Sequence, residues 1–325
     1  MEAGRMTGPE ISVVVPVYNA MAVVPGCLAS LDAQTLAPER YEVVVVDDGS
    51  TDATAGVVEA FLADARARFT FVRRPENRGP AAARNAGLAV ARAPLVAFTD
   101  SDCEVAPDWL ERALARFAAE PEVAGVEGRT DPKGDVGTLT HQMRNEAGGL
   151  FMTCNMVYRR EAIDAAGGFD ERFRLAFLED SDLAFAIMDA GGAIAWDPDV
   201  IVNHLVIHEG RGRFLKEAKK RYYNPLLFKK HPALYRAHLR PVVPGIPGIH
   251  VKYMASVLAP VVLAPWLPGL SVLLAPVFAW HLRRVAFAYK ARDPVSILQA
   301  AIHPFVQTYW VLAGAIKFRS FSLDL

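Results

Sequence analysis

The sequence is poor in cysteine and carries no excess of either charge. Its three cysteines, Cys27, Cys103 and Cys154, are scattered and odd in number, which fits neither a disulfide framework nor a zinc cluster and indicates a reducing compartment. A formal net charge of −1 gives no reason to expect nucleic-acid binding. Residues 1–10 lack the apolar stretch of a secretory signal, so we expect the N-terminal half to lie in the cytoplasm.

Short β-branched runs alternate with helical stretches in the first hundred residues. Ile11–Val17 and Tyr41–Val46 have the continuous apolar pattern of strands buried on both faces. Further strands are expected at residues 69–73 and 95–98, and helices at residues 23–34, 54–65 and 80–92. This βαβ order is typical of an open parallel sheet that collects ligands beyond the carboxyl ends of its strands.

Acidic residues stand at those strand ends. Asp47 and Asp48 follow the second strand, and Asp100 and Asp102 follow the strand that ends at Phe98. Carboxylates in this position can hold a hard divalent cation, which commonly bridges a protein to substrate phosphates. Aspartates after strands also form turns and helix caps, so the Asp-Ser-Asp triplet alone leaves both explanations open.

The pattern becomes mixed after residue 104. We expect a helix at 107–119, a strand at 123–129 and a loop-rich stretch at 130–149, and this half of the chain could hold the acceptor. A strand at 152–159 and a helix at 161–166 follow. Beyond the acidic cluster Glu179-Asp180-Ser181-Asp182, a helix is expected over Leu183–Ala190.

Six motifs in this order resemble those of family 2 glycosyltransferases, over about residues 11–208. They are Ser12–Asn19, Val45–Asp52, Asn77–Pro80 with Arg84–Gly87, Asp100–Asp102, Gly167–Glu171 and Glu179–Leu183. The resemblance implies an α/β GT-A fold, a Rossmann-like mixed sheet flanked by helices. It also implies a nucleotide-sugar donor, which we expect to be a UDP-sugar, a Mn²⁺ or Mg²⁺ ion, and inversion at the anomeric carbon.

The resemblance assigns nucleoside contacts to Pro16 and Tyr18 at the end of the first strand and to Asp48 at the end of the second. A carboxylate at position 48 is suited to accept protons of a base or ribose. Asp47 either caps the turn at Gly49 or contacts the ligand.

The same resemblance places Arg78 or Arg84 near the donor phosphates, where a guanidinium can pair bidentately, although either could be a solvated surface arginine. Asp102 resembles the metal ligand of the triplet, and Asp100 resembles a contact to ribose or metal. His204 and His208 lie where some relatives supply a further metal ligand, and a structural role is the alternative for each.

Inversion by a single displacement needs a base that takes the proton of the acceptor hydroxyl. By resemblance this base is Asp180, whose proton affinity Glu179 and Asp182 would raise if they lie close. An acidic first turn of a helix is the alternative, because the helix dipole favours it. For Asp182 we expect a helix N-cap.

The sequence departs from the family pattern at Ala186, because many relatives carry a basic residue six positions after the catalytic acid. The Gln-x-x-Arg-Trp signature of processive synthases is not present in the sequence, so we expect addition of one or a few sugars.

The last third of the chain has a different character. Residues 211–240 interleave basic and aromatic residues, as in a helix that lies on an anionic membrane, or as in a solvated helix face. Residues 254–280 and 295–316 are poor in charge, with prolines that suggest a re-entrant hairpin at 265–269 and a break at His303-Pro304. A buried helical core is the alternative.

We therefore expect a catalytic domain over residues 1–208, a basic amphipathic connector over 209–250, and membrane-associated helices over 251–325. The hypothesis is an inverting transferase at the cell membrane, with its catalytic domain cytoplasmic, that acts on a hydroxyl of a lipid-linked or cell-surface glycan. One alternative is transfer to a polyprenyl phosphate, which has little need of a base. Another is a catalytically inactive nucleotide-sugar-binding subunit. A nucleotidyltransferase is disfavoured, because no Gly-rich basic loop stands near the start.

Overall fold

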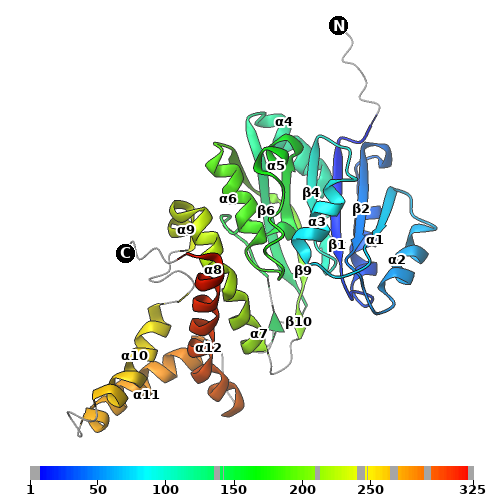
Figure 1. The fold of residues 1–325 in the computed structure, drawn as a ribbon. Coiled ribbons are helices and arrows are strands. Elements are labelled where there is room, and N and C mark those ends of the chain that lie inside the picture. Colours follow the sequence, from blue (N-terminus) through cyan, green and yellow to red (C-terminus); the bar gives the residue numbers. More distant parts are fainter. Residues whose placement is uncertain are drawn as a thin grey trace. The chain divides into compact units, whose positions relative to one another are not determined.

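The structure, a computed structural model, describes residues 8–134, 140–141, 143–208, 213–239, 246, 248–263, 270–288 and 294–320. The chain forms two compact units. Unit 1 comprises residues 1–136 and 141–207, and unit 2 comprises residues 137–140 and 208–325. In Figure 1, unit 1 runs from blue to green and unit 2 from yellow-green to red.

Unit 1 is built on a mixed sheet that has eight strands within the described residues. Across the sheet the order is β3 (Arg68–Arg73), β2 (Tyr41–Asp47), β1 (Ile11–Val17), β4 (Leu95–Phe98), β8 (Met156–Arg159), β6 (Val123–Lys133), β9 (Ala193–Leu205) and β5 (Cys103–Val105). β1 pairs in parallel with both β2 and β4, whereas β8 is antiparallel to β4. The strand order therefore reverses at β1, and open α/β sheets bind ligands at such switch points.

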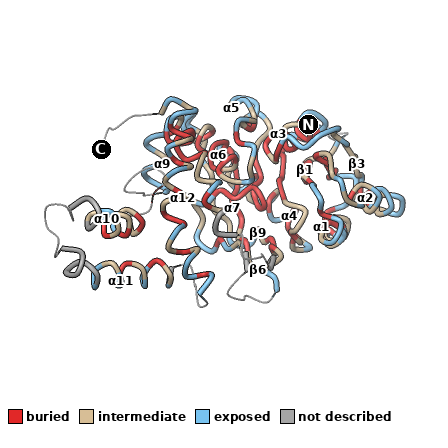
Figure 2. Tube along the Cα trace, turned by 60° about the horizontal axis from the view of Figure 1, so that its bottom comes forward, coloured by how far each residue is buried: buried red, intermediate tan, exposed pale blue. Residues whose placement is uncertain are grey.

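Helices cover both faces of this sheet (Figure 1). They are α1 (Val24–Asp32), α2 (Thr54–Leu62), α3 (Pro80–Leu88), α4 (Trp109–Ala119), α5 (Arg160–Ala166) and α6 (Glu179–Asp189). Val43 and Val45 of β2 pack in the cluster that includes buried residues of α1, α2 and α4, whereas Val44 and Val46 pack against α3. Alternate valines of one strand thus bury opposite faces, as its continuous apolar pattern predicted. Nearly all residues of β1 and all residues of β2 are buried. Helix α2 has more intermediate and exposed residues than buried ones (Figure 2).

The expected strands and helices of the first hundred residues are confirmed with small shifts of their ends. Two later expectations are wrong. Thr153–Asn155 forms a 3₁₀ turn before β8, because the Asn155 side chain donates to the carbonyls of Arg129 (2.7 Å) and Val200 (2.9 Å). Helix α6 begins at Glu179, so Asp182 lies inside its first turn and is not the N-cap.

Unit 2 is helical. Its elements are α7 (Arg213–Lys220), a 3₁₀ turn at Arg221–Tyr223, α8 (Asn224–Lys230), α9 (Pro232–Leu239), α10 (Gly248–Leu263), α11 (Leu270–Ala288) and α12 (Pro294–Phe318). Two short strands, β7 (Thr140–His141) and β10 (Ile207–His208), form a separate sheet. The hairpin turn expected at 265–269 lies outside the described residues.

Pro304 does not break α12, contrary to expectation. A proline removes one helix hydrogen bond, here to the carbonyl of Ala300, and α12 nevertheless continues from Pro294 to Phe318. Where the structure describes the chain, no helix combines the length and the apolar character needed to span a bilayer.

Candidate functional site

Two loops meet at the carboxyl ends of β1 and β2. Asn19 adopts a positive φ of 49°, which places its side-chain oxygen 2.8 Å from the backbone N–H of Thr51. Its own N–H donates to Ser50 Oγ at 2.9 Å. Asp47 accepts a hydrogen bond from the N–H of Ser50 (2.9 Å), which confirms the turn-capping alternative for this residue. Tyr18, the expected nucleoside contact beside this loop, is exposed.

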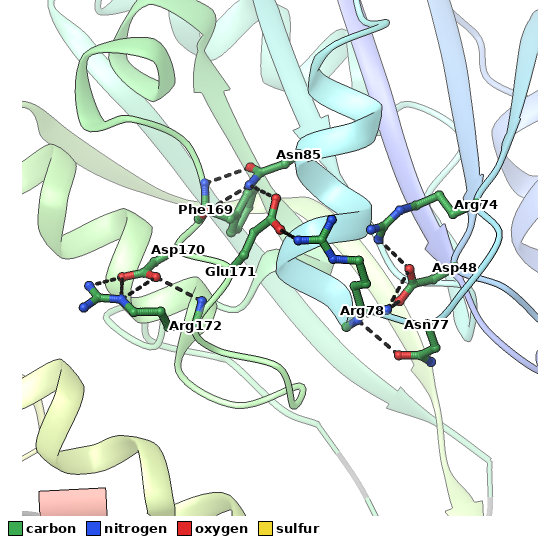
Figure 3. A network of polar contacts seen from close by, with 10 residues as sticks. Asp48, Arg74, Asn77, Arg78, Asn85, Phe169, Asp170, Glu171 and Arg172 are labelled. Atoms are coloured by element: carbon green, nitrogen blue, oxygen red, sulfur yellow. Dashed lines mark hydrogen bonds and ion pairs between the residues drawn. The ribbon is translucent and has the colours of Figure 1, made fainter. Parts of the chain in front are cut away.

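Asp48 is buried, and its carboxylate accepts hydrogen bonds from three donors (Figure 3). Oδ1 accepts from Arg74 Nη1 at 2.5 Å, and Oδ2 accepts from the backbone N–H of Gly79 at 2.8 Å. The backbone N–H of Arg78 is shared between the two oxygens, at 3.3 and 3.1 Å. Asp48 therefore fixes the loop before α3, and its nucleoside contact stays a prediction.

Helix α3 starts at a position that only glycine fits. Gly79 has a φ of 95°, and a Cβ atom added there would lie 2.5 Å from the carbonyl oxygen of Arg174. Six residues later, Asn85 exchanges hydrogen bonds with the backbone of Phe169, at 2.8 and 2.9 Å. Exposed Arg78 pairs with Glu171 at 2.9 Å (Figure 3). Helix α3 is thereby attached along its length to the segment that precedes α6.

Arg84 is a buried bridge between two acidic motifs. Its Nη1 lies 2.8 Å from Glu179 Oε1, and its Nη2 lies 2.8 Å from Asp100 Oδ1. The Arg84 and Glu179 side chains are only 3% and 4% exposed. Both ends of the guanidinium are thus used within the protein. Arg78 is exposed and pairs with Glu171, and the phosphate contact of either arginine stays a prediction.

Asp180 lies beside this bridge in the first turn of α6. Its Oδ1 accepts from the backbone N–H of Ser181 at 2.7 Å. Burial, reinforced by the neighbouring negative charge of Glu179, raises the pKa of Asp180 to about 7, while Arg84 opposes the rise. A carboxylate with this pKa can accept a proton near neutral pH and is suited to general-base work.

Asp102, the last residue of the Asp-Ser-Asp triplet, faces His204 of β9. Asp102 Oδ1 lies 3.5 Å from His204 Nε2, because β5 and β9 pair Cys103 with His204 in register. His204 Nδ1 lies 3.0 Å from the carbonyl oxygen of Leu205. That oxygen can only accept, so Nδ1 carries a proton and Nε2 is the ring nitrogen that faces Asp102.

This donor set fits a divalent cation. The oxygen of Asp102, the imidazole nitrogen of His204 and Cys103 Sγ all lie within 4.8 Å of one another. Carboxylate and imidazole suit Mn²⁺, whereas burial raises the pKa of the Cys103 thiol far above its usual range and keeps it protonated. Asp102 and His204 would therefore hold the ion, with Asp100 beside them. The side chain of His208, the other predicted ligand, lies outside the described residues.

One functional candidate was missed in the sequence. Glu127 is buried in β6 and accepts hydrogen bonds from the backbone N–H groups of Gly149 (2.6 Å), Leu150 (3.0 Å) and Phe151 (2.6 Å). It fixes the segment that follows the loop-rich stretch 130–149. The available signal was an acid directly after the apolar start of β6, Val123–Val126. Pro16 lies near the end of β1, as predicted.

Three comparisons bear on this arrangement. Over 122 residues the chain is 43% identical to validoxylamine A glucosyltransferase of Streptomyces hygroscopicus subsp. limoneus, an alignment that covers 37% of this chain and 26% of that protein. It is 29% identical over 210 residues to glycosyltransferase AglE of Haloferax volcanii, covering 61% and 67%. The mannosyltransferase PcManGT from Pyrobaculum calidifontis, solved with GDP-Man and Mn²⁺, superposes with a TM-score of 0.60 at 22% identity, covering 97% and 88%.

The structural likeness shows a GT-A-like fold. The alignments span only part of the curated relatives, about a quarter of the first and two thirds of the second. The profile of glycosyl transferase family 2 matches residues 12–174, which is half of the chain and contains β1, β2, α3 and the Asp-Ser-Asp triplet. The chain therefore belongs to glycosyl transferase family 2.

Proposed function

We propose that this protein transfers a sugar from a nucleotide-diphosphate donor, with inversion, to a hydroxyl of a lipid-linked or cell-surface glycan. The observation that carries the proposal is Asp180, whose pKa near 7 lies where a general base works best. A polyprenyl phosphate, the alternative acceptor, is already ionised and has no proton to give. With such an acceptor, Asp180 would not be needed as a general base.

The donor would lie over the switch point at β1. Tyr18 is exposed there, the backbone nitrogen of Asp48 lies 2.9 Å from the carbonyl oxygen of Val17, and exposed Arg78 belongs to the loop that Asp48 fixes. A UDP-sugar is the first expectation. The neighbour solved with GDP-Man makes GDP-sugars the second.

A Mn²⁺ or Mg²⁺ ion held by Asp102 and His204, with Asp100 beside them, would offset the negative charge of the departing diphosphate. Arg84 keeps Asp100 and Glu179 in fixed positions, so the leaving-group side and the base side of the site are held by one side chain. Glu179 keeps the Asp180 proton affinity high. The acceptor would approach from the Glu127 loop.

We place the reaction at the cytoplasmic face of the cell membrane, in the synthesis of envelope polysaccharide. The support is the composition of unit 2, whose charge-poor stretches at 254–280 and 295–316 flank basic residues.

The test is release of nucleoside diphosphate by the full chain from UDP-, GDP- and dTDP-sugars, with and without Mn²⁺. We expect one donor to be used, release to require the metal, and both Asp102→Ala and Asp180→Asn to abolish it. Asp199→Asn, which alters an exposed acid outside the site, is the matched control and should release normally. Tight donor binding without release would support the inactive-subunit alternative and contradict the proposal.

The acceptor class has its own test. With a hydroxyl acceptor, Asp180→Asn should lower turnover by at least about a hundredfold, as for the loss of a general base. Nearly unchanged transfer to a polyprenyl phosphate would instead identify that alternative. Product NMR should show the inverted anomer.

A further inference from the structure

Helix α12 places its large apolar side chains outward and its small or polar ones inward. Five side chains of one face, here called the outer face, are 44–65% exposed. They are Leu298, Ile302, Tyr309, Leu312 and Ile316. At 3.6 residues per turn these positions fall within an arc of about 80° and extend for about 27 Å.

The buried side of α12 carries small and polar residues and one large aliphatic residue, Val311. Its other members are Ser296, Ala300, His303, Pro304, Gln307, Gly314 and Ala315. Gly314 is required there, because a Cβ atom would lie 2.0 Å from the carbonyl oxygen of Tyr222. Figure 2 shows buried and exposed stretches alternating along α12. In a water-exposed helix the apolar stripe normally points to the core, so α12 has the reverse arrangement.

Neighbouring helices of unit 2 carry further exposed apolar side chains. Trp280 and Phe287 on α11 are 53% and 85% exposed, and Leu258 on α10 is 50% exposed. Arg284 stacks over the Trp280 ring, with its Cζ 4.8 Å from the ring centroid. Tryptophan is enriched at membrane–water interfaces, where its ring meets the lipid and its N–H meets water.

The charge of unit 2 decides between two occupants of this surface. Residues 208–325 contain 17 Lys and Arg but only four Asp and Glu, a net charge of +13, whereas residues 1–207 contain 18 and 32, a net charge of −14. A second copy of unit 2 would bring two strongly positive surfaces together. An anionic bilayer instead offers phosphate groups to the cations and acyl chains to the apolar side chains.

We propose that the outer face of α12 is a membrane-binding surface that lies along an anionic bilayer and inserts its apolar side chains among the lipids. Lys317 and Arg319, both exposed, follow the outer face at its C-terminal end and bind the lipid phosphates. This inference rests on the proposed function only for the membrane location, and it names the surface that would make the contact.

The test is co-sedimentation of the full chain with vesicles of phosphatidylcholine, with or without phosphatidylglycerol, at low and high salt. We expect binding to the anionic vesicles that weakens with salt. Leu298→Gln/Leu312→Gln should reduce it by about a hundredfold or more, because each buried leucine is worth at least about tenfold in partition. The matched control is Val90→Gln/Leu150→Gln, which alters exposed apolar residues of unit 1 and should bind normally.

Lys317→Glu/Arg319→Glu should weaken binding to anionic vesicles only. Equal binding by the outer-face and control variants, or no binding by the native chain, would overturn the inference. So would a native dimer that the outer-face variant converts to a monomer without any vesicle binding, since the surface would then hold a second copy. Nucleoside-diphosphate release, measured on the same proteins in detergent, separates this failure from failure of the proposed function.

Discussion

Replacement of Arg84 by methionine should destabilise unit 1 more than any comparable loss of an arginine at its surface. The substitution removes two hydrogen bonds of 2.8 Å and leaves Glu179, 4% exposed, without its cation. Breaking a buried ion pair in this way costs about 3–5 kcal/mol, which corresponds to a fall in melting temperature of about 10 °C.

The chain provides a matched control. Arg78 and Glu171 form an ion pair of nearly the same length, 2.9 Å, but their side chains are 53% and 39% exposed. Pairs exposed to this degree contribute at most about 1 kcal/mol, so Arg78→Met should change the melting temperature little. Both variants would be compared by thermal and denaturant unfolding of the full chain.

The double variant Arg84→Met/Glu179→Gln tests the cause. If the cost comes from the unpaired carboxylate of Glu179, a neutral glutamine there should restore part of the lost stability. Equal effects of Arg84→Met and Arg78→Met, or no recovery in the double variant, would refute the reasoning.

Turnover should rise with pH about a midpoint near 7, because a protonated Asp180 cannot accept the acceptor's proton; a flat rate profile between pH 5 and 9 (about two pH units either side of the midpoint) would contradict this. Gly87→Ala should cost about 1–3 kcal/mol in unfolding experiments, because its Cβ would lie 2.4 Å from a valine methyl of β1, whereas Gly56→Ala, with nothing within 4 Å, should not destabilise. His204→Ala should weaken Mn²⁺ binding, followed by electron paramagnetic resonance, by at least about tenfold, while Cys103→Ala should leave it unchanged, and the reverse result would reassign the ligands.

The sequence was most informative where local pattern decides structure. The valine runs of β1 and β2 must be buried on both faces, and the aspartates after β2 and β4 must fall at one edge of the sheet. The turn cap at Asp47 followed from the same local chemistry. For these features the neighbours in sequence are also the neighbours in space.

Other features depend on partners that are distant in sequence. Arg84 lies 95 positions from Glu179, and nothing local distinguishes it from a solvated arginine such as Arg78. The start of α6 was misplaced because residue 178, a leucine with a φ of 72°, is an unusual N-cap. The proline at position 304 predicted a break, but α12 continues through it.

The attachment of α3 to the segment before α6 bears on the engineering of this enzyme. Residues 78–85 and 169–179 are joined by the pairs Arg78–Glu171, Asn85–Phe169 and Arg84–Glu179. Exchange of either segment alone with that of a relative would leave a buried charge or amide without its match. The two segments should therefore be transplanted together when donor or acceptor preference is altered, and they form the natural unit of recombination in this fold.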